Sequence, residues 1–173
     1  MAVLRVPVSP SEHISGGEYA PVTLVECGDY QCPYCAEAFP IFEMVRKYFG
    51  DRLRFVFRHF PLTEVHPFAE YAAETAEFAS AQGLFWQMHG LLYANQPQLT
   101  VAVLLASARA LGLSEATLEA ALADRTYAPK VHEYFLGGVR SGDNSTPAFF
   151  IQGGRHDGSY DYESLTGAIS AAV

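Results

Sequence analysis

The sequence VTLVECGDYQCPYC, residues 22–35, contains a predicted strand, a turn and the start of a predicted helix. Residues 22–27 are β-branched and largely apolar, as expected for a strand buried on both faces of a sheet. Residues 28–31 predict a turn. Beyond it, apolar residues recur at intervals of three and four, which predicts an amphipathic helix over residues 34–49. Cys32 is therefore expected where the strand gives way to the helix.

Cys32 and Cys35 are separated by two residues, the spacing of a redox-active pair and also of half a zinc site. At the start of a helix, the sulfur of Cys32 faces unpaired N–H groups and the positive end of the helix dipole, and both favour a thiolate. A thiolate attacks disulfides, whereas a thiol does not. Cys35, one turn further on, is placed to displace a partner from a mixed disulfide on Cys32.

The composition restricts the possible functions of the chain. Its 173 residues are 50% hydrophobic, which is enough for one domain with its own core. The net charge of -8 argues against a nucleic-acid-binding surface. The sequence has no apolar run of transmembrane length, so no membrane insertion is expected. Three cysteines are too few for a disulfide framework, and this favours a catalytic pair.

The N-terminal residues predict a docked, partly irregular segment, because Pro7, Pro10 and Gly16-Gly17 interrupt any periodic pattern. Residues 1–10 lack the charged start, the apolar stretch and the cleavage site of a secretory signal. As written, the chain is expected in the cytoplasm; a periplasmic or other extracytoplasmic location applies if the N-terminus was truncated. A monomer is expected, because no long dimerisation segment precedes the cysteine pair.

The rest of the chain predicts an α/β fold. Residues 53–57 read as a second strand, and the strand–helix–strand order implies a right-handed parallel crossover. From about 67 to 140 almost every segment has helical periodicity, which predicts a helical insertion packed on the sheet. Residues 148–158 predict a hairpin with a glycine turn, and 162–172 a closing amphipathic helix. A single domain spanning residues 1–173 is expected.

Four separated motifs occur in a fixed order along the chain: VECGDYQCPYC (25–35), RHFPL (58–62), QGLFW (82–86) and Thr146-Pro147. Together they resemble the bacterial DsbA-like thiol–disulfide oxidoreductases over nearly the whole chain. The resemblance implies a thioredoxin fold with the helical insertion between its βαβ and ββα halves. It also implies a protein disulfide oxidoreductase that uses no cofactor and no metal. Its partners would be protein or peptide thiols and disulfides, and a redox partner that recycles the cysteine pair.

The same resemblance assigns the chemical roles. Cys32 is the nucleophile and Cys35 is the buried resolving thiol. Glu26 matches the buried acid behind the disulfide in this family, where a carboxylate relays the proton of Cys35 through water. The apolar neighbours of Glu26 favour burial, and a glutamate that faces solvent at a sheet edge is the alternative.

The resemblance also predicts a substrate surface beside the sulfurs. Thr146-Pro147 would be a cis step next to the disulfide, where the Thr146 backbone pairs with an extended peptide. Pro33 and Tyr34 are expected to line the same surface. Tyr34 stands where the best-known oxidants of the family carry histidine. A neutral phenol places no positive charge beside the Cys32 thiolate, so an intermediate redox potential is predicted.

Two other functions fit parts of the sequence. One is a peptide-binding or chaperone module that uses the cysteines only as a redox switch. The other is a metal site, because Cys27 joins Cys32 and Cys35 in a C-x4-C-x2-C spacing. Candidates for a further ligand are His59, His66 and His156. Cys27 is expected instead to be a small core residue, with a Cys27–Cys32 disulfide as a further alternative.

Overall fold

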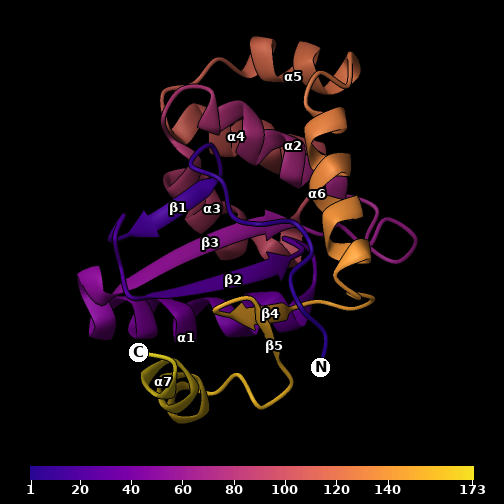
Figure 1. The fold of residues 1–173 in the computed structure, drawn as a ribbon. Helices are drawn as coiled ribbons and strands as arrows, with labels where there is room; N and C mark the ends of the chain where they lie inside the picture. The colour runs from indigo at the N-terminus through magenta and orange to yellow at the C-terminus, as the bar shows by residue number, and fades with distance from the viewer.

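The chain forms one five-stranded mixed sheet with the strand order β1-β3-β2-β4-β5, in a computed structural model that describes residues 1–173 (Figure 1). The strands are β1 (His13–Gly16), β2 (Val22–Gly28), β3 (Leu53–His59), β4 (Ala148–Ile151) and β5 (Gly154–His156). Strands β2 and β3 are parallel, and the other neighbouring pairs are antiparallel. The predicted parallel crossover and the predicted hairpin are confirmed.

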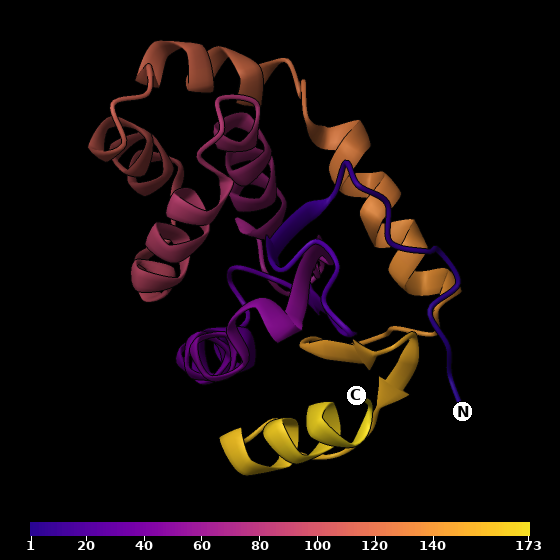
Figure 2. The same ribbon diagram turned by 60° about the vertical axis from the view of Figure 1, so that its left-hand side comes forward.

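Helix α1 (Pro33–Phe49) connects β2 to β3, and five helices lie between β3 and β4. These five are α2 (Ala69–Ser80), α3 (Phe85–Ala94), α4 (Val101–Ala110), α5 (Glu115–Ala123) and α6 (Ala128–Arg140). Helix α7 (Tyr162–Ala171) closes the chain, and short 3-10 turns cover Gly50–Arg52 and Gln96–Gln98. Helices α2 to α5 gather at the end of the molecule opposite α7 (Figures 1 and 2). The chain therefore has the predicted α/β fold class with a helical insertion.

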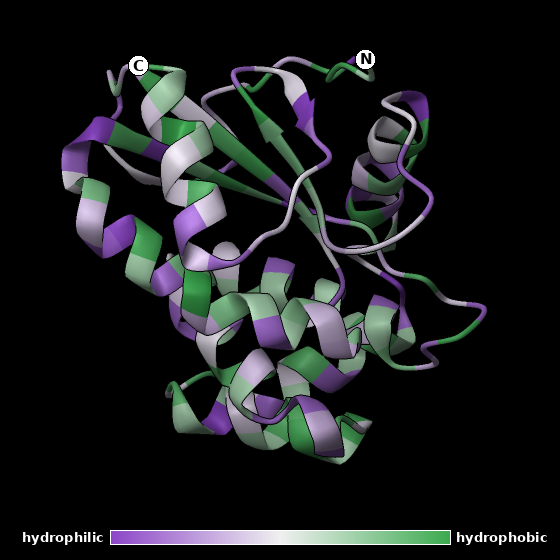
Figure 3. Ribbon diagram, turned by 90° about the horizontal axis from the view of Figure 1, so that it is seen from below, coloured by the Kyte–Doolittle hydropathy of each residue, from purple (hydrophilic) through white to green (hydrophobic).

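Strand β2 is buried along its whole length, as its apolar sequence predicts. Hydrophobic residues run along the central strands between the helices (Figure 3). On one face, Leu24 packs in the core with α1 and the insertion. On the other face, Val25 and Cys27 pack in a smaller cluster with Phe60, against which Phe135 of α6 also lies. Side chains alternate between faces along a strand, so neighbouring residues of β2 meet different surroundings.

The N-terminal segment is partly irregular, as predicted, but it contains a strand that its sequence does not indicate. Strand β1 pairs antiparallel with β3, with His13 opposite Phe57. The segment is docked as expected, since the N–H of Leu4 donates to Gly153 O at 2.8 Å. Four residues are too few to show a strand periodicity, and the hydrogen bonds come from the edge of β3.

Helix α6 contains two adjacent glycines that the structure distinguishes. A Cβ at Gly138 would lie 2.6 Å from the ring of Phe60, whereas a Cβ at Gly137 would lie 3.5 Å from Val6. Phe60 is 1% exposed and its ring stacks on Phe135, so it has little room to move. Close backbone approach to a buried ring therefore requires glycine at position 138 but not at 137.

We predict that Gly138→Ala lowers the free energy of unfolding by roughly 1–3 kcal/mol, because the added methyl group overpacks the Phe60 contact. Gly137→Ala is the matched control and raises it by up to about 1 kcal/mol, because alanine has the higher helix propensity. Urea denaturation of both variants measures the difference. Equal effects of the two substitutions would contradict this account of the packing.

Candidate active site

Cys32 lies at the junction of β2 and α1, where the sequence predicts it. It is the N-cap residue of α1 with extended backbone angles, φ -72° and ψ 122°, and Pro33 occupies the first turn. Proline suits this place because its missing N–H would have no partner inside the helix. Cys35 is fully buried at 0% exposure, while Cys32 retains 3%. Only the sulfur of Cys32 thus lies at the edge of the core.

The two thiols have opposite electrostatic surroundings. The Cys35 thiol donates a hydrogen bond toward the Cys32 sulfur and lowers the pKa of Cys32 to about 5, although burial opposes this. The side chain of Thr146 and the N–H groups of Cys35 and Tyr34 also lower the Cys32 pKa. The two N–H groups act at longer range, because the sulfur accepts no capping hydrogen bond from the first turn of α1. Burial raises the pKa of Cys35 well above its ordinary value, and the bond to Cys32 and the charge of Glu26 raise it further.

Thr146 and Pro147 lie directly beside the cysteine pair. The bond between them is cis, and the carbonyl oxygen of Thr146 is 3.6 Å from the Cys32 sulfur, which donates to it. The Thr146 hydroxyl is also buried, and apart from its effect on the Cys32 sulfur it has no hydrogen-bond partner. The structure therefore brings together the cysteine pair and the Thr146–Pro147 step, which are more than a hundred residues apart in the sequence.

Glu26 is buried on β2 at 3% exposure, so the alternative of a solvent-facing glutamate is wrong. Burial is the main cause that raises its pKa to about 8, and the charge of the Cys32 thiolate adds to the effect. Glu26 in turn raises the pKa of Cys35. A carboxyl group with this pKa holds a proton at neutral pH and can exchange it with a nearby group.

Two exposed residues and one half-buried tyrosine border the pair. Pro33 is exposed, and Tyr34 is 62% exposed on the first turn of α1. Tyr160, which precedes α7, lies close enough for the two cysteines to raise its pKa, although burial and Glu37 contribute more. Tyr160 was not predicted from the sequence, because it comes from a loop without a motif of its own.

Cys27 does not join the other two cysteines. It is 1% exposed in the cluster on the opposite face of the sheet from Cys32 and Cys35. Burial and the Asp143 carboxylate raise its pKa well above the ordinary value. The expectation of a small core residue is confirmed. The alternatives of a three-thiolate metal site and of a Cys27–Cys32 disulfide are wrong, because Cys27 lies on the other face of the sheet from Cys32 and Cys35.

The histidines considered as further ligands have partners of their own. His59 Nε2 is 2.8 Å from Glu77, His66 Nδ1 is 2.7 Å from Asp29, and His156 bonds to Ser159 O. None of these contacts involves the cysteine pair.

A second polar cluster lies away from the cysteines. His13 and His59 both contact one carboxylate oxygen of Glu77, and the Lys130 ammonium group is 2.7 Å from the other. The three ligand atoms lie close enough to hold a metal ion. However, Lys130 already supplies the positive charge, and His59 Nδ1 lacks the partner that metal-bound histidines have. The contacts therefore describe a buried cluster of charges that joins β1, β3, α2 and α6.

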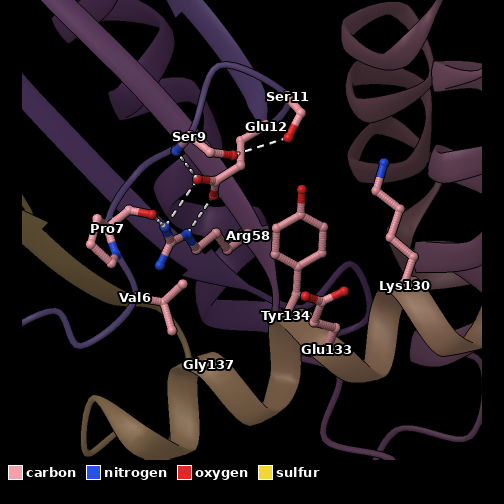
Figure 4. A pocket seen from close by; sticks show the side chains of 10 residues that line it. All are labelled: Val6, Pro7, Ser9, Ser11, Glu12, Arg58, Lys130, Glu133, Tyr134 and Gly137. Atoms are coloured by element: carbon pink, nitrogen blue, oxygen red, sulfur yellow. Dashed lines mark hydrogen bonds and ion pairs between the residues drawn. The ribbon is translucent and has the colours of Figure 1, made fainter.

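Beside this cluster is a cavity of about 340 Å³ between the N-terminal segment, β3 and α6 (Figure 4). Its wall contains the buried ion pair of Glu12 and Arg58, whose closest atoms are 2.6 Å apart. Tyr134 and Lys130 of α6 lie across from this pair in Figure 4. The cavity is lined by neither cysteine of the pair.

Comparison with known proteins agrees with this geometry. A family model described as thioredoxin matches residues 8–171. The structure of oxidised BdbD from Bacillus subtilis superimposes with a TM-score of 0.88 and 25% identity, covering 99% of this chain and 97% of that one. Alpha-DsbA1 from Wolbachia pipientis gives a TM-score of 0.84 at 18% identity, covering 98% and 94% of the two chains.

Sequence relatives include much longer proteins. The chain is 46% identical over 172 residues to the Na+/H+ antiporter NhaA 1 of Salinispora arenicola, which covers 98% of this chain but 26% of that protein. An NhaA antiporter of Herminiimonas arsenicoxydans is 38% identical with similar coverage. The chain thus spans about a quarter of the length of the curated relatives it matches. None of its helices combines the length and apolar composition that a membrane crossing requires.

The family match extends over almost the whole chain, and the fold of BdbD is reproduced along its full length. The Cys32–Cys35 pair lies at the start of α1, beside the cis step at Thr146–Pro147. The chain therefore belongs to the thioredoxin family and has the DsbA-like oxidoreductase fold.

Proposed function

We propose that the chain exchanges disulfides with protein or peptide substrates, with Cys32 as the nucleophile and Cys35 as the resolving thiol. The observation that carries this proposal is the difference between the two thiols. The pKa of Cys32 is lowered to about 5, whereas that of Cys35 is raised by burial. At neutral pH, Cys32 is then a thiolate and a good leaving group, and Cys35 keeps its proton.

In the oxidising direction, a substrate thiolate attacks the Cys32 sulfur of the disulfide. The Cys32–Cys35 bond breaks, its electron pair goes to Cys35, and Cys35 takes up a proton. A second substrate thiolate then attacks the substrate sulfur of the mixed disulfide, and Cys32 leaves as a thiolate. The substrate gains one disulfide and loses two electrons to the cysteine pair. A redox partner removes these electrons, and the same steps in reverse reduce a substrate disulfide.

Glu26 is proposed as the proton donor and acceptor for Cys35. It lies on the buried side of the pair, and its pKa of about 8 allows both protonation states near neutral pH. Thr146 and Pro147 are proposed to hold an extended substrate peptide through the Thr146 backbone, with Pro33 and Tyr34 on the same surface. Tyr34 brings no positive charge to the thiolate, which supports a redox potential between those of strong oxidants and strong reductants.

We predict that Cys32→Ser abolishes exchange activity on a reduced or scrambled protein substrate. Cys35→Ser instead accumulates a mixed disulfide on Cys32, because no resolving thiol remains. Gel analysis without reductant detects the adduct, and Cys27→Ser is the control that retains activity because Cys27 lies on the other face of the sheet. Full activity of Cys32→Ser would overturn the proposal and favour a peptide-binding module with a redox switch.

We also predict that the stability of the reduced protein relative to Glu26→Gln falls as the pH rises from about 4.5 to about 8. A carboxyl group with a raised pKa in the folded state stabilises that state only while it is protonated. Each pKa unit corresponds to about 1.4 kcal/mol. Urea denaturation across this range measures the difference, and exposed Glu18→Gln is the control. A constant difference between the wild type and Glu26→Gln would show that Glu26 is not buried as an acid.

A further inference from the structure

The carboxylate of Asp29 lies inside the turn that joins β2 to α1, and its side chain is 0% exposed. Each of its oxygens accepts two hydrogen bonds. Oδ1 accepts the backbone N–H groups of Gln31 at 2.7 Å and Cys32 at 3.1 Å. Oδ2 accepts the N–H of Leu62 at 2.9 Å and contacts Nδ1 of His66 at 2.7 Å. One buried carboxylate thus joins the turn before the nucleophile to the loop after β3.

The Oδ1 contacts fix the backbone of Cys32. Its N–H is directed at Asp29, since the backbone carbonyl of Asp29 also accepts it, at 3.2 Å. With its N–H held in this way, Cys32 keeps the extended angles of an N-cap residue. Those angles place its sulfur at the start of α1 and 3.6 Å from Thr146 O. The Cys35 thiol, the Thr146 side chain and the N–H groups at the start of α1 favour the thiolate, and they act on the sulfur only while the Cys32 backbone keeps these angles.

The Oδ2 contacts fix the loop between β3 and α2. His66 is 18% exposed, and the neighbouring Val65 is 67% exposed. The N–H of Phe68, at the end of the loop, donates to the Gln31 side chain at 2.8 Å. The ring of His66 has no partner for Nε2, which is not enclosed by the protein. The loop therefore presents an apolar residue and a free ring nitrogen beside the Cys32 turn.

We propose that Asp29 is the positioning residue of the active site, that its Oδ1 directs the Cys32 sulfur, and that the loop after β3, which its Oδ2 holds through His66, contacts the substrate. The second half, which concerns Oδ2, His66 and the substrate, rests on the proposed function. The first half, which concerns Oδ1 and the Cys32 sulfur, does not. If Asp29 positions the sulfur, its removal raises the Cys32 thiol pKa, whereas if Asp29 acts only as a negative charge, its removal has the opposite effect. A carboxylate close to a thiolate raises the thiol pKa, so its removal would lower that pKa.

The thiol pKa of Cys32 separates these two roles. It is measured on reduced protein in a Cys27→Ala background, by the ultraviolet absorbance of the thiolate against pH. Asp29→Ala removes the Oδ1 acceptor and is expected to raise the thiol pKa by about one unit, a tenfold loss of thiolate below the pKa. Asp29→Asn keeps an oxygen acceptor for the two N–H groups without the charge, and is expected to restore most of the wild-type value.

Glu12→Ala is the matched control for loss of a buried carboxylate, because Glu12 accepts hydrogen bonds from Ser9 and Arg58 on the other side of β3. It is expected to destabilise the protein and leave the thiol pKa unchanged. A lower thiol pKa in both Asp29 variants would overturn the positioning role in favour of charge. An unchanged thiol pKa in folded Asp29→Ala would overturn it as well. If Asp29→Ala does not fold, Asp29→Asn decides between position and charge.

The second half is tested with His66→Ala, which leaves the Oδ1 contacts in place. The expected result is a thiol pKa close to that of the wild type and a severalfold higher KM for a dithiol peptide. His66→Asn, whose side-chain amide nitrogen replaces Nδ1, is expected to restore the KM. An unchanged KM in His66→Ala would overturn this half of the proposal. If the wild type oxidises no peptide, the proposed function fails, while the titration of Asp29 variants still tests the first half.

Discussion

The sulfur of Cys32 is held at the N-terminus of α1, and the chemistry of the site depends on that contact. The Cys35 thiol approaches it from within the helix, and the side chain of Thr146 approaches from the loop before β4. Pro33 lets the helix begin directly after the nucleophile without leaving an unpaired N–H. Together these groups stabilise a thiolate at a position that is only 3% exposed. The buried partner thiol has the opposite preference, so one pair contains both a leaving group and a proton carrier.

The register of β2 determines which residues can take part. Side chains alternate between the faces of the sheet, so Glu26 lies on the side of the cysteine pair and Cys27 on the opposite side. A shift by one residue would exchange them, bringing a third thiol to the site and removing the acid. Burial of β2 on both faces fixes this register. The hydrophobic core therefore specifies the composition of the active site as well as the stability of the fold.

Local patterns predicted most of the fold. The strand at 22–27, the helix after Cys32 and the helices between β3 and β4 all show the periodicity that one-sided or two-sided burial requires. Strand β1 escaped prediction because it is short and depends on the edge of β3. The contacts of Asp29 with Leu62 and His66 escaped it because they join distant segments. An aspartate in a turn before a helix does indicate that its carboxylate caps nearby N–H groups. That pattern predicts the contacts with Gln31 and Cys32 but not those with the distant loop.

The most direct test is the thiol titration of the reduced wild-type protein, with Cys27→Ala to remove the third thiol and Cys32→Ser to assign the signal. Cys32 is expected to ionise with a pKa of about 5, and Cys35 is expected to remain a thiol far above it. The signal should disappear in Cys32→Ser. Ionisation of Cys32 near its ordinary value of 9.0 would contradict the central claim that the start of α1, Cys35 and Thr146 together hold a thiolate.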